Sequence, residues 1–85
     1  MKILMLSVAG LLLPLLVWAG PVNVNTADAE LISKELVGIG LSKAQAIIDF
    51  RNEYGSFESA EELVKVKGIG PRVLAANAGN ILVDD

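Results

Sequence analysis

The chain has 85 residues, with ten carboxylate side chains against seven lysines and arginines, and it contains no histidine and no cysteine. This composition excludes disulfides, catalysis by a thiol or an imidazole, and the common kinds of zinc site. A formal charge of −3 argues against binding of nucleic acid over the whole surface, so that function would need a local basic patch.

The first nineteen residues are predicted to be a secretory signal peptide. A lysine stands at the second position, and residues 3–17 form an almost unbroken apolar run, shorter than the roughly 20 apolar residues that span a bilayer. Val17 and Ala19 then supply the residues of a cleavage site before Gly20. We expect an exported, periplasmic protein of residues 20–85 without a stable membrane anchor. An uncleaved anchor is the alternative interpretation.

Four short helices joined by glycines are predicted beyond this leader. Thr26 is the expected N-cap of a helix over residues 27–36, and Gly38 ends that helix because glycine adopts positive φ without penalty. Ser42 is the expected N-cap of a second helix over residues 42–54, in which apolar residues recur at helical spacing.

The third and fourth helices are shorter. Ser59 and Glu62 have the spacing of a capping box, in which the hydroxyl and the carboxylate accept from backbone N–H groups of the first turn, and the helix that follows ends at Lys65. Pro71 suits the first position of the last helix, which continues to about Ala78. No segment alternates at period two, so no β-sheet is expected.

Two copies of one pattern overlay at a period of 30 residues: LVGIGLSK at 36–43 and VKGIGPRV at 66–73. Each copy reads as helix, glycine hairpin, helix, and a single copy cannot bury its apolar face alone. The two copies are therefore predicted to form one all-α domain, residues 20–85, packed as a pseudo-twofold bundle. Its hairpins lie at about residues 37–41 and 67–71.

Four apolar residues are predicted to belong to the core of this bundle. Ile39 and Ile69, in the middle of the two turns, are expected to point inward and anchor each hairpin to its helices. Tyr54 and Phe57, near the connection between the copies, are expected at the edge of the core.

The Gly-Ile-Gly turns have the chemistry of a phosphate site. Each turn precedes a helix and gathers N–H groups that lack intrahelical partners, while glycine permits close approach and the helix dipole favours an anion. Lys43, Lys67 and Arg72 stand beside these turns and can bind the same or neighbouring phosphates. Two such hairpins could hold both strands of a duplex across its minor groove without reading bases. Alternatively, each turn is only a tight helix connection with solvated charges.

Residues 23–83 resemble the ComEA family of competence proteins through VNVNTA at 22–27, LVGIGLSKAQAII at 36–48 and FRNEYGSFESAEELVKVKGIG at 50–70. The resemblance implies a tandem helix-hairpin-helix domain, a SAM-domain-like bundle of four to five short helices. It also implies sequence-independent binding of double-stranded DNA in the periplasm and a role in DNA uptake during natural transformation. DNA-uptake or pilus components are further partners that it implies.

By this resemblance, the DNA-binding residues fall on the two hairpins and the polar positions beside them: Gly38, Ile39, Gly40, Ser42, Lys43, Lys67, Gly68, Ile69, Gly70 and Arg72. Related hairpins bind a monovalent cation through turn carbonyls, and no other cofactor or metal is implied. Val37 stands where the family often has proline, and Leu41 is apolar beside the presumed phosphate. The first hairpin is therefore expected to bind more weakly than the second.

The sequence bears on two other functions. The pair Glu61-Glu62 does not predict an active site, because adjacent residues on a helix point apart and acidic side chains are favoured in a first helical turn. The protein is therefore not expected to be an enzyme. The competing function is a protein-docking module of a secretion or pilus assembly, because tandem hairpins also serve as docking surfaces.

Export is expected to remove residues 1–19. A cut after Ala19 follows the pattern of a signal-peptide cleavage site, whereas a cut one residue later would leave Pro21 directly after it. The intact mass of the protein recovered from the periplasm should therefore correspond to a chain that begins at Gly20. A mass that includes the leader would instead indicate an anchored receptor.

Overall fold

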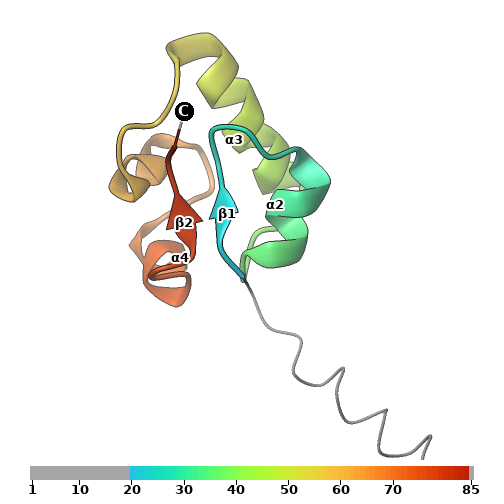
Figure 1. The fold of residues 1–85 in the computed structure, drawn as a ribbon, viewed down its shortest axis with the longest axis vertical. Coiled ribbons are helices and arrows are strands. Elements are labelled where there is room, and N and C mark those ends of the chain that lie inside the picture. Colours follow the sequence, from blue (N-terminus) through green and yellow to red (C-terminus); the bar gives the residue numbers. More distant parts are fainter. Residues whose placement is uncertain (1–19, 85) are drawn as a thin grey trace, which may run out of the picture.

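The computed structural model of the chain describes residues 20–84, so the predicted signal peptide lies outside the described residues. Four helices and two short strands follow one another in this part of the chain (Figure 1). They are β1 (Val22–Asn23), α2 (Ala29–Glu35), α3 (Leu41–Tyr54), the 3-10 helix η2 (Ala60–Lys65), α4 (Pro71–Ala76) and β2 (Ile81–Leu82). Among residues 20–84, none of the helices has the length and apolar character that crossing a membrane requires.

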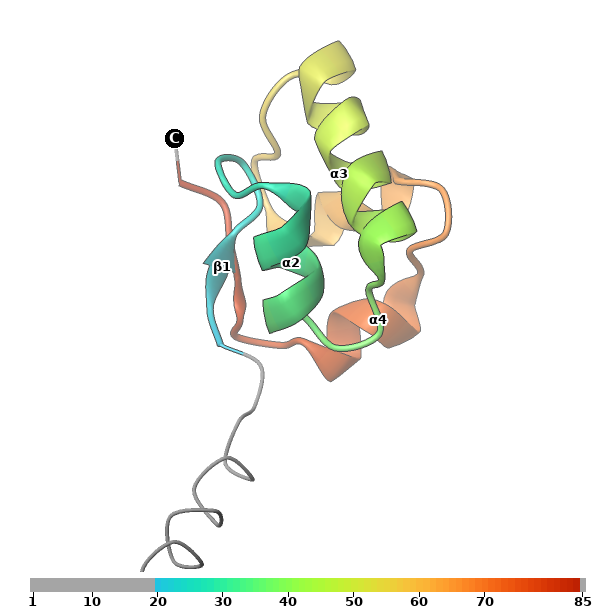
Figure 2. The ribbon, with the colours of Figure 1, turned by 90° about the vertical axis from the view of Figure 1, so that its right-hand side faces the viewer.

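The helices form two pairs, as the repeat predicts. Helix α2 contacts α3, and η2 contacts α4, each pair being joined by one of the glycine hairpins. Figure 2 shows the connection between α2 and α3 passing beside α4, while the turn between η2 and α4 lies on the side of the molecule opposite β1. The two copies are thus interleaved, so that the hairpin of the first copy lies against a helix of the second.

The core draws apolar side chains from both copies. Helices α2, α3 and η2 each contribute one large side chain that is fully buried: Ile32, Ile47 and Leu63. Ile39 and Ile69 are also buried, which confirms that the middle residue of each hairpin is anchored in the core. The expectation that Phe57 and Tyr54 both lie at the edge of the core is wrong. Phe57 is fully enclosed, whereas the Tyr54 side chain is 67% exposed at the end of α3.

Two short parallel strands correct the expectation that the domain has no sheet. Strand β1 pairs with β2 in the register Val22 to Ile81 and Asn23 to Leu82. The N–H of Val24 also donates to the Leu82 carbonyl at 3.0 Å. Each strand has only two residues, so neither could show a period-two pattern in the sequence. The strands close the domain by joining the segment before its first helix to the segment after its last.

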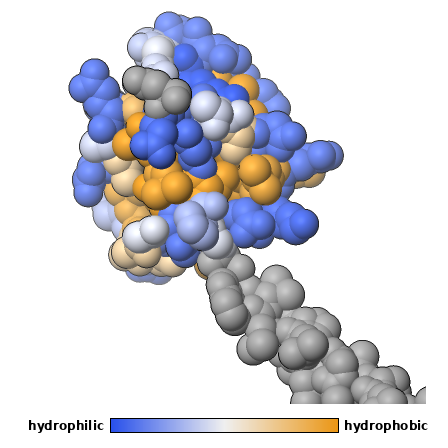
Figure 3. Space-filling view, in the orientation of Figure 1, coloured by the Kyte–Doolittle hydropathy of each residue, from blue (hydrophilic) through white to orange (hydrophobic). Residues whose placement is uncertain are grey.

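The surface over these strands is apolar. In the orientation of Figure 1, apolar side chains gather in the middle of the molecule over β1, β2 and the neighbouring helix α2 (Figure 3). Leu82 of β2 and Leu31 of α2 are among the exposed large apolar residues of the described chain. This face lies away from the second hairpin, so the molecule presents two chemically different sides.

Two of the predicted N-caps are wrong. The side chain of Asp28, not Thr26, accepts from the N–H of Leu31 at 2.8 Å and caps α2, because Thr26 belongs to a turn that closes on the Asn23 carbonyl. Helix α3 begins one residue earlier than expected, with Gly40 as its N-cap and no capping side chain. The hydroxyl of Ser42 is therefore not used as a cap.

The predicted capping box is also wrong. Ser59 is the N-cap residue of η2, but its side chain makes no capping hydrogen bond. The Glu62 carboxylate accepts from the N–H of Glu58 at 2.9 Å, one residue before the expected donor. The segment closes with i to i−3 bonds, such as Glu62 N–H to the Ser59 carbonyl at 3.1 Å, and is a 3-10 helix.

Two asparagine side chains join the two copies. The carboxamide of Asn77, which is completely buried at the end of α4, accepts from the Val37 N–H at 2.7 Å and donates to the Val37 carbonyl at 2.9 Å. The carboxamide of Asn25 contacts Phe57 in the same way, accepting from its N–H at 2.7 Å and donating to its carbonyl at 3.0 Å. Each copy thus holds the backbone of the other through one amide group.

Replacing Asn77 with alanine should lower the free energy of unfolding by about 2 kcal/mol. The change removes three hydrogen bonds, two to Val37 and one from Nδ2 to the Val73 carbonyl, and leaves their partners less well satisfied. Urea denaturation followed by circular dichroism measures the loss. Asn52→Ala is the matched control, because this asparagine is exposed on α3. Equal stabilities for the two variants would contradict a structural role for the buried amide.

Candidate nucleic-acid interface

The two hairpins have the same backbone conformation. Gly38 and Gly68 lie at φ +78° and +94°, in the region that side chains of L-residues rarely adopt. Gly40 and Gly70 are extended and serve as the N-caps of α3 and α4. The first glycine of each turn is therefore required by its dihedral angle. The dihedral angles of the second glycine do not require glycine. Binding of phosphate would explain its presence, because the absence of a side chain allows the phosphate to approach the backbone closely.

Each hairpin presents backbone donors at its surface. Among residues 20–84, the N–H groups of Gly38, Gly40 and Leu41 have no hydrogen-bond acceptor. The second hairpin offers fewer such donors, because Pro71 has no N–H and Ile69 donates to the Val66 carbonyl at 3.0 Å. An anion at the first hairpin would thus meet more backbone dipoles than an anion at the second.

Lys43 connects the two hairpins. It stands in the first turn of α3, and its Cε lies 3.4 Å from the position that a β-carbon on Gly68 would occupy. Its aliphatic chain therefore lies across the turn of the second hairpin, although it follows the first hairpin in sequence. The structure thus brings the predicted residues Lys43 and Gly68 together.

The second hairpin carries two exposed cations. Lys67 lies on its turn and Arg72 in the first turn of α4, and both are exposed. Within the described residues, neither they nor Lys43 lies within 4.0 Å of a carboxylate; the ion pair found there joins Lys65 to Glu62. These three side chains are therefore free of an ion-pair partner in this part of the chain.

The other basic residues differ in role. Nη1 of Arg51 donates to the carbonyls of Val24 at 2.7 Å and Ala27 at 2.8 Å, so this guanidinium holds the loop before α2. Lys65 is paired with Glu62 at 4.0 Å. Lys34 is exposed on α2. Three of the six lysines and arginines of residues 20–84 thus lie beside the hairpins, namely Lys43, Lys67 and Arg72.

The remaining predicted site residues differ in what they expose. Ser42 and Arg72 occupy equivalent positions of the repeat, two residues after the second glycine, and both side chains are exposed. Ile39 and Ile69 are buried, so only their backbone atoms face the hairpin surface. A ligand at either hairpin would therefore contact glycine backbone and polar side chains, while the isoleucines set the position of the turn.

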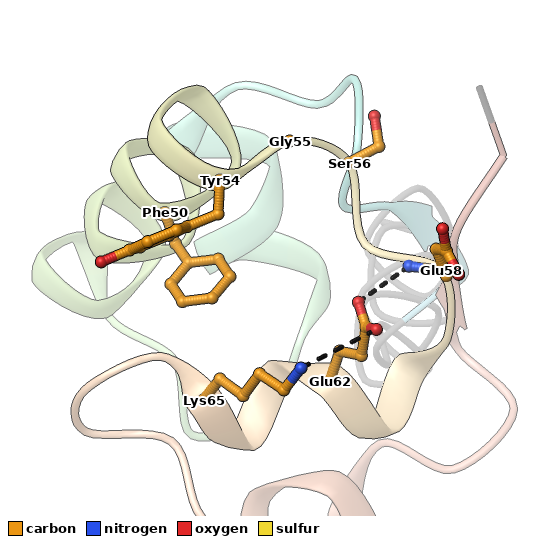
Figure 4. Close-up of a pocket in the computed structure, with 7 residues that line it drawn as sticks. All are labelled: Phe50, Tyr54, Gly55, Ser56, Glu58, Glu62 and Lys65. Carbon is orange, nitrogen blue, oxygen red and sulfur yellow. Dashed lines mark hydrogen bonds and ion pairs between the residues drawn. The ribbon is translucent and has the colours of Figure 1, made fainter.

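A hollow in the surface lies away from the hairpins. It has a volume of about 430 Å³ and is lined by residues from the end of α3, the following loop and η2: Phe50, Tyr54, Gly55, Ser56, Glu58, Glu62 and Lys65 (Figure 4). The ring of Phe50 stacks on the ring of Phe57, with the ring centroids 5.3 Å apart, and contacts the ring of Tyr54, with the centroids 4.5 Å apart. Residues 20–84 contain no group of three or more metal-ligating side chains. The lining of this hollow thus offers no metal centre within the described residues.

One residue that positions the site was missed by the sequence reasoning. Asn77 holds the first turn through Val37, yet the equivalent position of the first copy is Ile47, so the repeat gives no signal for it. The only sign of this role in the sequence is that Asn77 is a polar residue among the apolar residues near the end of α4.

Comparison with known proteins agrees with this geometry. A family model described as "Helix-hairpin-helix motif" matches residues 17–82. An uncharacterized protein of Haemophilus influenzae is 47% identical over 60 residues, which cover 71% of this chain and 54% of that protein. ComE operon protein 1 of Bacillus subtilis is 47% identical over 51 residues, which cover 60% of this chain and 24% of that protein. The chain belongs to the helix-hairpin-helix family and is a ComEA-like protein within it.

The shared segment also occurs inside much larger proteins. Human endonuclease/exonuclease/phosphatase family domain-containing protein 1 is 44% identical over 54 residues, which are 62% of this chain but 9% of that protein. The chain spans about half the length of the Haemophilus relative and a quarter of the Bacillus relative. The matched family model describes a motif and indicates no catalytic family.

Replacing Gly68 with valine should destabilise the fold by about 1–3 kcal/mol, because a β-branched residue is strained at φ +94° and its side chain would meet Lys43. Gly40→Ala is the control, since Gly40 is extended and nothing lies within 4 Å of the added carbon. Thermal unfolding of both variants measures the difference. A Gly68→Val protein as stable as Gly40→Ala would show that the turn does not depend on its positive φ.

Proposed function

We propose that the paired hairpins bind the phosphate backbone of double-stranded DNA without sequence preference. The observation that carries this proposal is the position of Lys43, which follows the first hairpin but lies on Gly68 of the second. A cation that follows the first turn thereby reaches the second, and the two turns share one backbone conformation, with more backbone donors at the first and the exposed Lys67 and Arg72 at the second. A duplex offers phosphates on two strands, and a pair of adjacent anion sites fits that arrangement.

The chemistry of the site favours backbone binding over base reading. Backbone N–H groups and the cationic heads of Lys67 and Arg72 are donors to phosphate oxygens, and such contacts position a protein on a duplex without carrying sequence information. Lysine and arginine can also read guanine in the major groove, but the position of these cations beside the backbone donors of the hairpins favours contacts to phosphate. Sequence-independent binding follows from this set of groups.

The cellular role follows from the family. The ComEA-like character of the chain and the printed name of its Bacillus relative support a role in competence, namely uptake of DNA during natural transformation. The predicted signal peptide supports action in the periplasm. Components of the uptake machinery or of a pilus are the protein partners consistent with this role, and a monovalent cation on turn carbonyls would complete a hairpin without contributing catalysis.

A second candidate function is a protein-docking module of a secretion or pilus assembly. The observation that favours it is the apolar face over the two strands, where Leu31 and Leu82 are exposed on the side away from the second hairpin (Figure 3). This face lies away from Lys67 and Arg72 of the second hairpin (Figures 2 and 3), so protein docking there and DNA binding by these cations are separable by mutation.

Alanine at both Lys67 and Arg72 should reduce the salt dependence of DNA binding. If these two side chains and Lys43 neutralise about three phosphates, log K against log salt has a slope of roughly −2.7, and the double variant should have a slope of about −0.9. Fluorescence polarisation with unrelated duplexes over a range of salt concentrations measures both slopes. Preference among sequences should not change.

Lys34→Ala with Lys65→Ala is the matched control, because it removes the same charge outside the hairpins. Its slope should stay near that of the unmodified protein. A folded Lys67→Ala, Arg72→Ala protein with an unchanged slope would show that these cations do not contact DNA, and the docking function would then be the better interpretation.

A further inference from the structure

The two hairpins share a backbone but differ in the side chains that flank it. At the position before the first glycine, the first hairpin has Val37 and the second has Lys67; after the second glycine, they have Leu41 and Pro71. Val37 is 52% exposed and Leu41 is 58% exposed, although the middle residue between them is buried. The core therefore does not account for these two apolar side chains.

Their surroundings place them beside an anion site. Leu41 is the first residue of α3, and its own N–H is one of the donors without an acceptor among the described residues. Val37 is fixed by its backbone bonds to Asn77, which leave its side chain facing solvent. Any phosphate bound by the first hairpin would have these two side chains as its immediate neighbours.

We infer that the first hairpin selects deoxyribose over ribose, so that the protein binds duplex DNA in preference to duplex RNA. This inference rests on the proposed binding of DNA by the hairpins. In a nucleic acid strand each phosphate is flanked by sugars, so a turn that grips a phosphate sets its neighbouring side chains against those sugars. Val37 and Leu41 would contact the C–H surface of deoxyribose.

Ribose would be disfavoured at the same place. Its 2′-hydroxyl is a donor and an acceptor displayed in the minor groove of duplex RNA, and it is the group by which proteins distinguish RNA from DNA. Covering it with two apolar side chains would remove water without supplying a hydrogen-bond partner, which is costly for a polar group. Lys67 at the equivalent position of the second hairpin can donate to such a hydroxyl and would not discriminate.

The position of the pair favours a sugar over a protein or a lipid as its contact. Lys43, two residues after Leu41, reaches the second hairpin, so the apolar pair is continuous with the cationic part of the proposed interface. The larger apolar face over the strands lies on the side away from the second hairpin (Figures 2 and 3).

The test compares duplexes of one sequence as DNA, as RNA, and as RNA with 2′-fluoro in place of each 2′-hydroxyl, which keeps the A-form shape but removes the hydroxyl. The unmodified full chain should bind DNA about tenfold more tightly than RNA, with the fluoro duplex close to DNA. Val37→Thr with Leu41→Ser should bring the ratio of DNA to RNA affinity to within about twofold, because these substitutions supply hydroxyl partners without changing charge. The salt slope should not change.

Leu31→Ser is the matched control, since this leucine is 43% exposed on α2, and it should keep the preference of the unmodified protein. A fluoro duplex bound as weakly as RNA would overturn the inference, because groove shape would then explain the preference. An equal loss of DNA and RNA affinity in the Val37→Thr, Leu41→Ser protein would overturn it as well. In both cases the proposed function would stand. Failure of the unmodified protein to bind any duplex at low salt would overturn both.

Discussion

Reciprocal amide contacts between the two copies hold the first hairpin against the second copy. Asn77 of the second copy binds both backbone groups of Val37 in the first, and Asn25 of the first binds both backbone groups of Phe57 in the second. Apolar contacts bring the two copies together but do not fix their relative orientation. Hydrogen bonds from an amide group are directional and do fix it. Because the Asn77 amide is fully buried, its bonds cannot be exchanged cheaply for bonds to water.

The electrostatic character of the site depends on this arrangement. With the first turn held against α4, the helix that follows it directs Lys43 over Gly68, and a residue of one copy adds its charge to the hairpin of the other. Arg51 meanwhile donates to the carbonyls before α2, and Lys65 is paired with Glu62. An acidic chain can therefore gather three cations, Lys43, Lys67 and Arg72, beside its second hairpin.

The sequence predicted the features that depend on local backbone chemistry and on the repeat. Gly38 and Gly68 have the positive φ expected of them, Pro71 begins its helix, and the isoleucine of each turn is buried. The features it missed depend on contacts between distant residues. The strands have two residues each and exist because the two ends of the domain meet, and the Asn25 and Asn77 contacts join residues 32 and 40 positions apart. Thr26 was predicted to be the cap of α2, but it lies in the turn that closes on Asn23, and Asp28 caps the helix instead.

The differences between the hairpins suggest a division of roles within one binding surface. The first hairpin has more unpaired N–H donors and no charge on its turn, whereas the second has Lys67 and Arg72 but lacks the donor that Pro71 cannot provide. Contacts between cationic side chains and phosphates release counterions, so they weaken as the salt concentration rises. Contacts from neutral backbone N–H groups release no counterions and depend less on salt. A duplicated motif that kept one backbone conformation could thus combine a salt-sensitive contact that attracts the duplex with a less salt-sensitive contact that positions it. The conserved element between the copies is the geometry of the turn, and the divergence lies in the side chains beside it.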